Sequence, residues 1–167
     1  MILKYFNKEL LINLILIALI FFFDRTSKAY VISLANQNLT SEIFLTSFIN
    51  ISLIWNDGIA FGLLSFQDDF FYDVITILIS LIIFILIVLS FRSEKLKKYS
   101  YILVTGGALG NLFDRITYGS VPDFIDLHYN EFHWFIFNIA DIFITIGVIF
   151  IVFFEIINET NNANEKI

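Results

Sequence analysis

Two aspartates, Asp123 and Asp141, lie 18 residues apart, and the second falls within a stretch that otherwise has the composition of a membrane span. A carboxylate in hydrocarbon costs ~2.5–3.5 kcal/mol even on the lenient insertion scale, so acids in such stretches are functional candidates. Two carboxyl groups that approach each other tend to share one proton. The pair therefore predicts proton-transfer chemistry.

Such a carboxyl pair can hydrolyse an amide when a water molecule lies between the two groups. The ionised member takes a proton from the water, and the neutral member polarises the carbonyl and then protonates the departing nitrogen. The two proton affinities belong to the pair rather than to either residue. Desolvation favours Asp141 as the protonated member. A purely structural hydrogen bond to a neighbouring helix is the alternative explanation of Asp141.

The composition indicates a membrane protein. The chain has 167 residues, of which 58% are hydrophobic, above the ~45–50% that is usual for globular domains, and we expect one integral membrane domain over residues 1–167. A net charge of −6 argues against a nucleic-acid partner, and the lack of cysteine excludes thiolate chemistry. His128 and His133, five residues apart in one loop, could ligate a metal, but no supporting ligand set is evident. We therefore interpret them as interfacial polar residues and expect neither a metal nor a cofactor.

Four apolar stretches predict an all-α membrane protein with four transmembrane helices, over approximately residues 10–30, 70–91, 99–116 and 132–157. A span needs ~20 mainly apolar residues. The second and fourth stretches have that length outright, whereas the first and third reach it only by including polar residues at one end.

Residues 33–69 are too polar for a span. Within them, partly alternating β-branched and aromatic residues precede a turn at residues 56–58. We expect a small extracytoplasmic β-hairpin or sheet over approximately residues 40–66, lying on the helical bundle. A turn with no further role is the alternative explanation of residues 56–58.

The distribution of positive charge predicts the orientation in the membrane. Lys4 and Lys8 precede the first span, and four further basic residues lie in residues 92–98, between the second and third spans. The other two connections are mainly acidic. The positive-inside rule therefore places both termini and residues 92–98 in the cytoplasm.

With that topology, polar residues from several segments gather at the outer side of the membrane, while the inner halves of the spans are nearly free of charge. Counted along a helix from Trp134 at ~1.5 Å per residue, Asp141 would lie ~10 Å into the bilayer. Residues with independent structural roles would scatter over both leaflets, so the shared level favours one site. The residues expected there are Asp24, Lys28, Asn56, Gly58, Gly107, Asn111, Asp114, Arg115, Asp123, Asn138 and Asp141.

Some of these residues have simpler explanations. Asp24 and Lys28, which are i,i+4 neighbours, are also consistent with an ordinary interfacial ion pair. Gly106 and Gly110 fit close helix packing better than phosphate binding, because no Gly-Lys-Ser/Thr sequence follows them. Arg115 offers either a donor to a bound peptide or a partner for Asp114.

At these residues the chain resembles the lipoprotein signal peptidases (signal peptidase II). The matching segments occur in the family's order and cover most of the chain. The resemblance implies an aspartic endopeptidase of the bacterial inner membrane that acts in the outer leaflet on diacylglyceryl-modified prolipoproteins, cutting just before the lipidated cysteine. It also implies sensitivity to globomycin-type inhibitors. The segments are residues 24–28, 56–62, 106–115, 121–126 and 137–141.

The resemblance also implies a role for each matching residue. Asp123 and Asp141 would form the catalytic dyad. An unwound substrate exposes backbone polar groups near hydrocarbon, and the predicted hairpin could pair with it as a strand. Arg25 and Pro122 look like tolerable variations of the pattern. The remaining roles are substrate binding at Asn56, Gly58, Asn111, Arg115 and Asn138, and support of the site at Asp24, Lys28, Gly107 and Asp114.

Two other functions compete with the peptidase. A proton-coupled transporter or channel subunit would use Asp141 as its proton site, but it requires a polar path through the inner leaflet and often internal repeats, which the sequence lacks. A non-catalytic assembly factor held together by Gly106 and Gly110 leaves both aspartates unexplained. Besides bilayer lipid and substrate we expect no partner, and the protein is expected to be a monomer.

Overall fold

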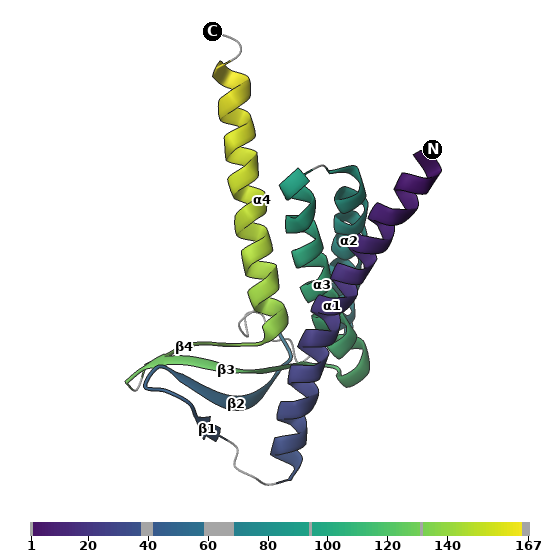
Figure 1. The fold of residues 1–167 in the computed structure, drawn as a ribbon. Coiled ribbons are helices and arrows are strands. Elements are labelled where there is room, and N and C mark those ends of the chain that lie inside the picture. The colour runs from purple at the N-terminus through teal and green to yellow at the C-terminus, as the bar shows by residue number, and fades with distance from the viewer. Residues whose placement is uncertain (1, 38–41, 59–68, 94, 131, 165–167) are drawn as a thin grey trace.

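In the described residues, four helices run side by side, and a small antiparallel sheet lies near one end of three of them, while the first helix continues past it (Figure 1). This computed structural model describes residues 2–37, 42–58, 69–93, 95–130 and 132–164. Both termini lie at the end of the molecule that is far from the sheet (Figure 1). The helices are α1 (Ile2–Asn36), α2 (Asp69–Arg92), α3 (Lys95–Tyr118) and α4 (Ile139–Asn164).

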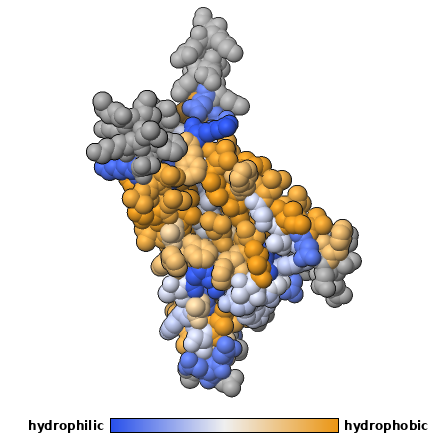
Figure 2. All heavy atoms as spheres, turned by 90° about the vertical axis from the view of Figure 1, so that its right-hand side faces the viewer, coloured by the Kyte–Doolittle hydropathy of each residue, from blue (hydrophilic) through white to orange (hydrophobic). Residues whose placement is uncertain are grey.

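Within the described part of the chain, three helices are long and apolar enough to cross a membrane: Lys8–Asn36, Tyr72–Arg92 and Ile139–Asn158. Large apolar side chains on these helices point outward, such as Ile77 on α2, which is 67% exposed. Figure 2 shows that apolar residues cover the middle of the molecule, with hydrophilic residues at both ends. This apolar belt fits a lipid environment, because exposed apolar surface together with helices of membrane-spanning length is typical of membrane proteins.

The fourth helix, α3, differs in composition from the other three. Its 24 residues would reach ~36 Å at ~1.5 Å per residue, which is long enough to span. It packs against α1, α2 and α4, so most of its side chains meet protein. Polar residues are therefore tolerated on α3, and they lower its hydropathy. The prediction of four spans is confirmed for three helices by length and composition.

Close packing of α1 on α3 depends on two glycines. A Cβ atom on Gly106 would lie 2.8 Å from the Cβ of Ile20, and one on Gly110 would collide with the carboxylate of Asp24. Real Cβ atoms do not approach their neighbours so closely, so any side chain at either position would push α1 away. The interpretation of these glycines as packing residues is confirmed.

The sheet has the order β1-β2-β3-β4, with every neighbouring pair antiparallel. Its strands are β1 (Glu42–Phe44), β2 (Ile49–Asn56), β3 (Val121–Tyr129) and β4 (Phe132–Phe137). The expected small sheet is thus confirmed. However, β2 pairs with β1 and β3, and the second half of the predicted hairpin, within residues 59–68, lies outside the described residues.

Strands β3 and β4 correct two predictions. β3 occupies what the sequence indicated as a loop, and β4 occupies the first residues of the predicted fourth span, so α4 begins only at Ile139. Short apolar segments do not distinguish strand from helix by pattern alone, and the aromatic and β-branched residues of β4 favour a strand. Because Trp134 lies in β4, the helical count that placed Asp141 ~10 Å into the bilayer is wrong. Asp141 lies in the first turn of α4.

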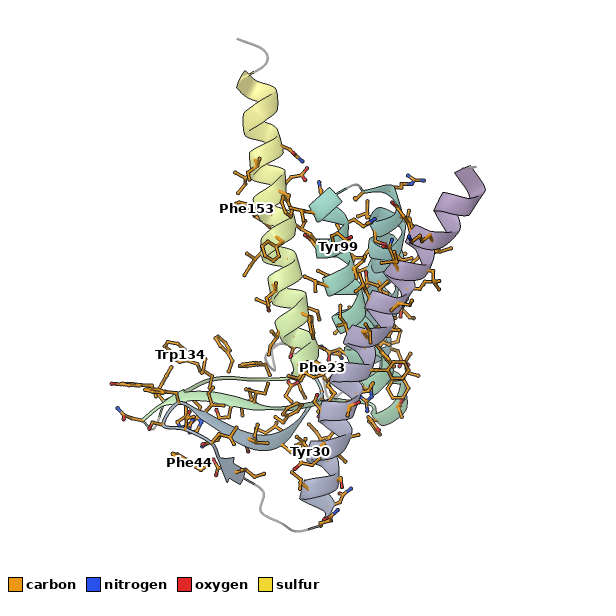
Figure 3. All side chains as sticks on the ribbon, in the orientation of Figure 1. Phe23, Tyr30, Phe44, Tyr99, Trp134 and Phe153 are labelled. Atoms are coloured by element: carbon orange, nitrogen blue, oxygen red, sulfur yellow. The ribbon has the colours of Figure 1, made fainter. Side chains whose placement is uncertain are left out.

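Aromatic side chains are exposed on the sheet as well as on the helices. Phe44 on β1 is 71% exposed and Trp134 on β4 is 60% exposed, and Figure 3 shows both at the sheet end of the molecule. Tyr99 and Phe153 lie on α3 and α4, away from the sheet (Figure 3). Tyr and Trp concentrate at membrane–water boundaries, so Trp134 is placed as an interfacial residue would be.

Candidate active site

The structure brings Asp123 and Asp141 to one cavity of about 360 Å³ between the helices and the sheet. Asp123, which falls in the connection expected between the third and fourth spans, lies on strand β3, and Asp141 lies at the start of α4. A rigid strand and a helix end therefore carry the two carboxyl groups.

Side-chain amides hold the carboxylate of Asp123 at both oxygens. The Nδ2 of Asn56 donates to Oδ2 at 2.8 Å, and the Nδ2 of Asn138 donates to Oδ1 at 2.6 Å. Asp123 is only 3% exposed, and this burial, with the neighbouring charge of Asp141, raises the pKa of its carboxyl to about 6. The two amide donors oppose the rise.

The backbone fixes the orientation of both amides. The Oδ1 of Asn56 accepts from the Gly58 N–H at 2.9 Å, and the Oδ1 of Asn138 accepts from the Asp141 N–H at 3.1 Å. An amide has one acceptor end and one donor end, so each oxygen held in this way turns its NH₂ group toward Asp123. Asp123 thus meets two donors whose direction does not depend on solvent.

The N-terminus of α4 is built around Asp141. Asn138 is the N-cap residue, and the Oδ2 of Asp141 accepts in return from the Asn138 N–H at 3.1 Å, which completes a reciprocal capping box. The Oδ1 of Asp24 accepts from the Ala140 N–H at 2.9 Å. A Cβ on Gly107 would lie 2.5 Å from the Ala140 carbonyl oxygen, so this glycine lets α3 approach. A helix N-terminus favours negative charge on Asp141.

A series of buried hydrogen bonds connects Asp141 to side chains of α3 and α1. The Nδ2 of Asn111 donates to its Oδ1 at 2.8 Å, and the Nζ of Lys28 donates to the Oδ1 of Asn111 at 2.7 Å. The same ammonium group lies 2.7 Å from Asp114 and 2.8 Å from Asp24. The side chains of Lys28, Asp24 and Asp114 are all fully buried, so their charges depend on one another for compensation.

Two arginines complete the network, and one of them was missed by the sequence reasoning. Arg25 donates to Asp114 and lies over the ring of Phe113 at 4.7 Å. From the sequence we interpreted Arg25 as a tolerable variation. Its position next to Asp24 on α1 could have indicated that it belongs to the site. Because Asp114 is paired in this way, Arg115 does not bind it and instead donates to the Gly58 carbonyl.

Apolar walls surround this polar centre. A second cavity of about 270 Å³ lies on the β4 side of Asp141, so this carboxylate faces both cavities. The first cavity is lined largely by aliphatic side chains of α2, α3 and α4, and the second by Phe135, Phe137, Ile142, Thr145 and Ile146 besides Asp141.

Every residue that the sequence placed at the site belongs to this network. The arrangement places two carboxyl groups beside an apolar surface, with neutral amides among their nearest donors, and such a pair could support the attack of water on an amide. That Asp141 is the protonated member stays a prediction. His128 and His133 lie elsewhere, on paired strands and not in one loop as predicted.

Comparisons with known proteins agree with this geometry. The family model for signal peptidase (SPase) II matches residues 16–157. The lipoprotein signal peptidase of Pelagibacter ubique (strain HTCC1062) is 48% identical over 159 residues, covering 95% of this chain and 96% of the relative. That of Anaplasma marginale (strain Florida) is 40% identical over 144 residues, covering 85% and 82%.

Two solved structures of bacterial membrane enzymes have the same fold. One, at 2.3 Å resolution, matches with a TM-score of 0.70 and 31% identity over 90% of each chain. The other, at 1.9 Å, matches with a TM-score of 0.65 and 34% identity over 84% of this chain and 90% of its own. The chain belongs to the signal peptidase II family.

Proposed function

We propose that this protein is a membrane aspartic endopeptidase that removes signal peptides from diacylglyceryl-modified prolipoproteins, cutting just before the lipidated cysteine. The observation that carries the proposal is that Asp123 and Asp141 line one cavity and are both held by oriented amides. The curated relatives are lipoprotein signal peptidases, which supports the substrate class.

In the proposed mechanism the dyad of Asp123 and Asp141 shares one proton and binds a water molecule. The ionised carboxylate takes a proton as the water oxygen attacks the scissile carbonyl carbon, while the protonated carboxyl donates to the carbonyl oxygen. Collapse of the tetrahedral intermediate breaks the C–N bond: the protonated carboxyl gives its proton to the departing cysteine nitrogen, and the ionised carboxylate takes one from a hydroxyl of the intermediate, which restores the shared proton. Because the amides carry no charge, they lower the basicity of the carboxylates less than cationic donors would.

The substrate is proposed to bind in an extended form beside β2. β1 pairs with β2 only at residues 50–52, so in the described structure the rest of that edge, residues 53–56, has no strand partner. Nη1 of the buried Arg115 also has no partner among the described residues, and it is proposed to donate to a substrate carbonyl. Asn56 and Gly58, at the end of β2, would bind the peptide, and the apolar cavity walls would contact its hydrophobic segment.

The proposed setting is the bacterial inner membrane, with residues 1–167 as one monomeric domain and α3 as a fourth span. Both termini would lie in the cytoplasm and the site would face the outer leaflet. In support, the termini share the end of the molecule that is far from the sheet (Figure 1), and the basic residues Arg92, Lys97 and Lys98 lie near the connection of α2 to α3. Globomycin-type inhibitors are proposed to bind in the same cavity.

The test uses purified full-length protein in detergent with a lipobox peptide that carries diacylglycerol on its cysteine. We expect cleavage on the N-terminal side of that cysteine, identified by mass spectrometry, and much slower cleavage of the unlipidated peptide. An inactive wild type in several lipids and detergents would contradict the proposal. Proton flux through liposomes containing the protein, without peptide cleavage, would instead favour the transporter.

A further inference from the structure

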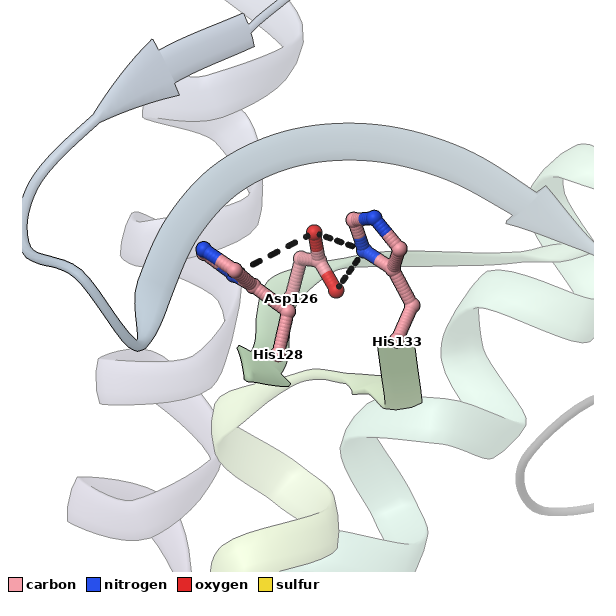
Figure 4. Close-up of side chains that lie close together, drawn as sticks. All are labelled: Asp126, His128 and His133. Atoms are coloured by element: carbon pink, nitrogen blue, oxygen red, sulfur yellow. Dashed lines mark hydrogen bonds and ion pairs between the residues drawn. The ribbon is translucent and has the colours of Figure 1, made fainter. Parts of the chain in front are cut away.

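Three side chains with metal-binding atoms meet on the paired strands β3 and β4 (Figure 4). The Nδ1 of His133 lies 2.8 Å and 3.0 Å from the two carboxylate oxygens of Asp126. The Nδ1 of His128 lies 3.8 Å from the nearer of these oxygens. One ligand atom from each residue falls within 4.8 Å of the others.

A β-bulge creates this cluster. Asp126 and His128 are two residues apart on β3, so they share one face of the strand. The pairing of β3 with β4 shifts by one residue between Leu127, which faces Phe135, and His128, which faces His133. Without the shift, His128 would face Trp134 and His133 would point to the other side of the sheet.

The burial of the cluster distinguishes it from a surface group of polar residues. The side chain of Asp126 is 2% exposed and that of His128 is 8% exposed. The Nδ1 of His128 is buried and has no hydrogen-bond partner in the part of the chain that the structure describes. Buried polar atoms rarely lack a partner, so this nitrogen is available to a ligand that the described residues do not supply. His133 is 52% exposed and provides access from solvent.

We propose that Asp126, His128 and His133 bind a divalent transition-metal ion of the Zn²⁺ class, with water as a fourth ligand. Imidazole nitrogen and carboxylate oxygen are common zinc ligands, at about 2.0–2.2 Å from the metal, which separates tetrahedral ligand atoms by about 3.3–3.6 Å. The distances of 2.8 Å and 3.8 Å from the two histidine nitrogens to the Asp126 carboxylate lie on either side of that range. The ion gives the His128 nitrogen its partner, whereas a simple hydrogen bond between His133 and Asp126 leaves it without one.

The proposed ion would tie β3 to β4 beside the dyad. Asp123 lies three residues before Asp126 on β3, and Asn138 directly follows β4. The metal site is therefore a structural clip on the hairpin that carries both residues. The ion takes no part in the proposed hydrolysis, so the metal-site proposal can be tested independently of the peptidase activity.

The test is a titration of untagged, metal-stripped, full-length protein in detergent at neutral pH. Co²⁺ is the spectroscopic probe, because visible absorption distinguishes a four-coordinate site from the hexa-aqua ion. Calorimetry and thermal unfolding follow Zn²⁺. We expect one ion per chain, an intense Co²⁺ spectrum, and a higher Tm with Zn²⁺.

Asp126→Asn and His133→Gln should each weaken binding at least about tenfold and abolish the Zn²⁺-dependent rise in Tm. Asp73→Asn, at an exposed carboxylate on α2, and Asp141→Asn, in the dyad, should bind like wild type. His133 is half exposed, so its variant is expected to fold. Absence of saturable binding to the wild type, or equal affinity in wild type, Asp126→Asn and His133→Gln, would overturn the proposal.

Discussion

Asp123 and Asp126 are two buried aspartates on one strand, three residues apart and on opposite faces, yet their surroundings differ. Asp123 accepts hydrogen bonds from the side-chain amides of Asn56 and Asn138, which are uncharged and do not titrate. Asp126 lies against two imidazoles, His128 and His133, which accept protons or metal ions. Burial alone therefore does not decide the role of a carboxylate. The chemistry of the neighbouring side chains decides it.

The largest expected effect separates the two aspartates by activity. Asp123→Asn removes a member of the proposed dyad and should lower the cleavage rate by ~10²–10⁴-fold, the usual contribution of general acid–base catalysis. Asp126→Asn removes a carboxylate from the same strand and should stay within about tenfold of wild type. Initial rates with the lipidated lipobox peptide measure both. Similar losses of activity in the two variants would contradict the different roles assigned to Asp123 and Asp126.

The second effect concerns the buried charges behind the amides. Lys28→Met leaves Asp24 and Asp114 without their shared cation and should lower the free energy of unfolding by about 3–5 kcal/mol. The matched control is Lys97→Met, which breaks a more exposed pair with Glu155 and should cost at most about 1 kcal/mol. Denaturant titration in micelles measures both variants. Equal losses would show that the Lys28 cluster is not energetically coupled.

The third effect is the pH dependence of stability. Burial raises the pKa of Asp123 from 3.8 to about 6, so the folded protein holds this proton more tightly than the unfolded chain. The stabilisation from this group is complete below pH ~4 and is lost as the pH rises through about 6, by at most about 3 kcal/mol. Asp123→Asn lacks this loss. Its Tm relative to wild type should therefore increase from pH 4 to pH 7, and a constant difference would contradict the raised pKa.

The smallest expected effect on stability separates the two functions of Asn138. Asn138→Ala removes the N-cap of α4 and the donor to Asp123, and should cost ~0.5–2 kcal/mol of stability as well as activity. Asn138→Ser keeps a capping oxygen but loses the longer amide donor. We expect Tm near that of wild type with activity still reduced. Full activity in the Ser variant would mean that the bond to Asp123 is dispensable.

Much of the site was predictable from the sequence, because polar residues in apolar segments are conspicuous. Lys28 and Asp141 each stand in a helix whose other residues are mainly apolar, and the structure joins them through Asn111 in one chain of hydrogen bonds. The close packing at Gly106 and Gly110 was also predictable, since small residues four apart share one helix face.

The sheet was harder to predict, because its pairings join segments far apart in the sequence. Strand β3 pairs with β2 across about 70 residues, and the apolar pattern of β4 alone is also consistent with the start of a helix. The cluster at Asp126 was unpredictable for the same reason, since it depends on a one-residue shift between β3 and β4. Such registers depend on tertiary pairing and not on local composition.

The most direct test of the proposed dyad is a double-mutant cycle with Asp123→Asn and Asp141→Asn, measured as kcat for the lipidated peptide. Two carboxylates that act on one water molecule form a unit, so losing the second should add little once the first is gone. We expect the double variant to be within a few-fold of the slower single variant, with all proteins folded by thermal unfolding. Losses that multiply, or substantial activity in the double variant, would contradict the shared-proton mechanism.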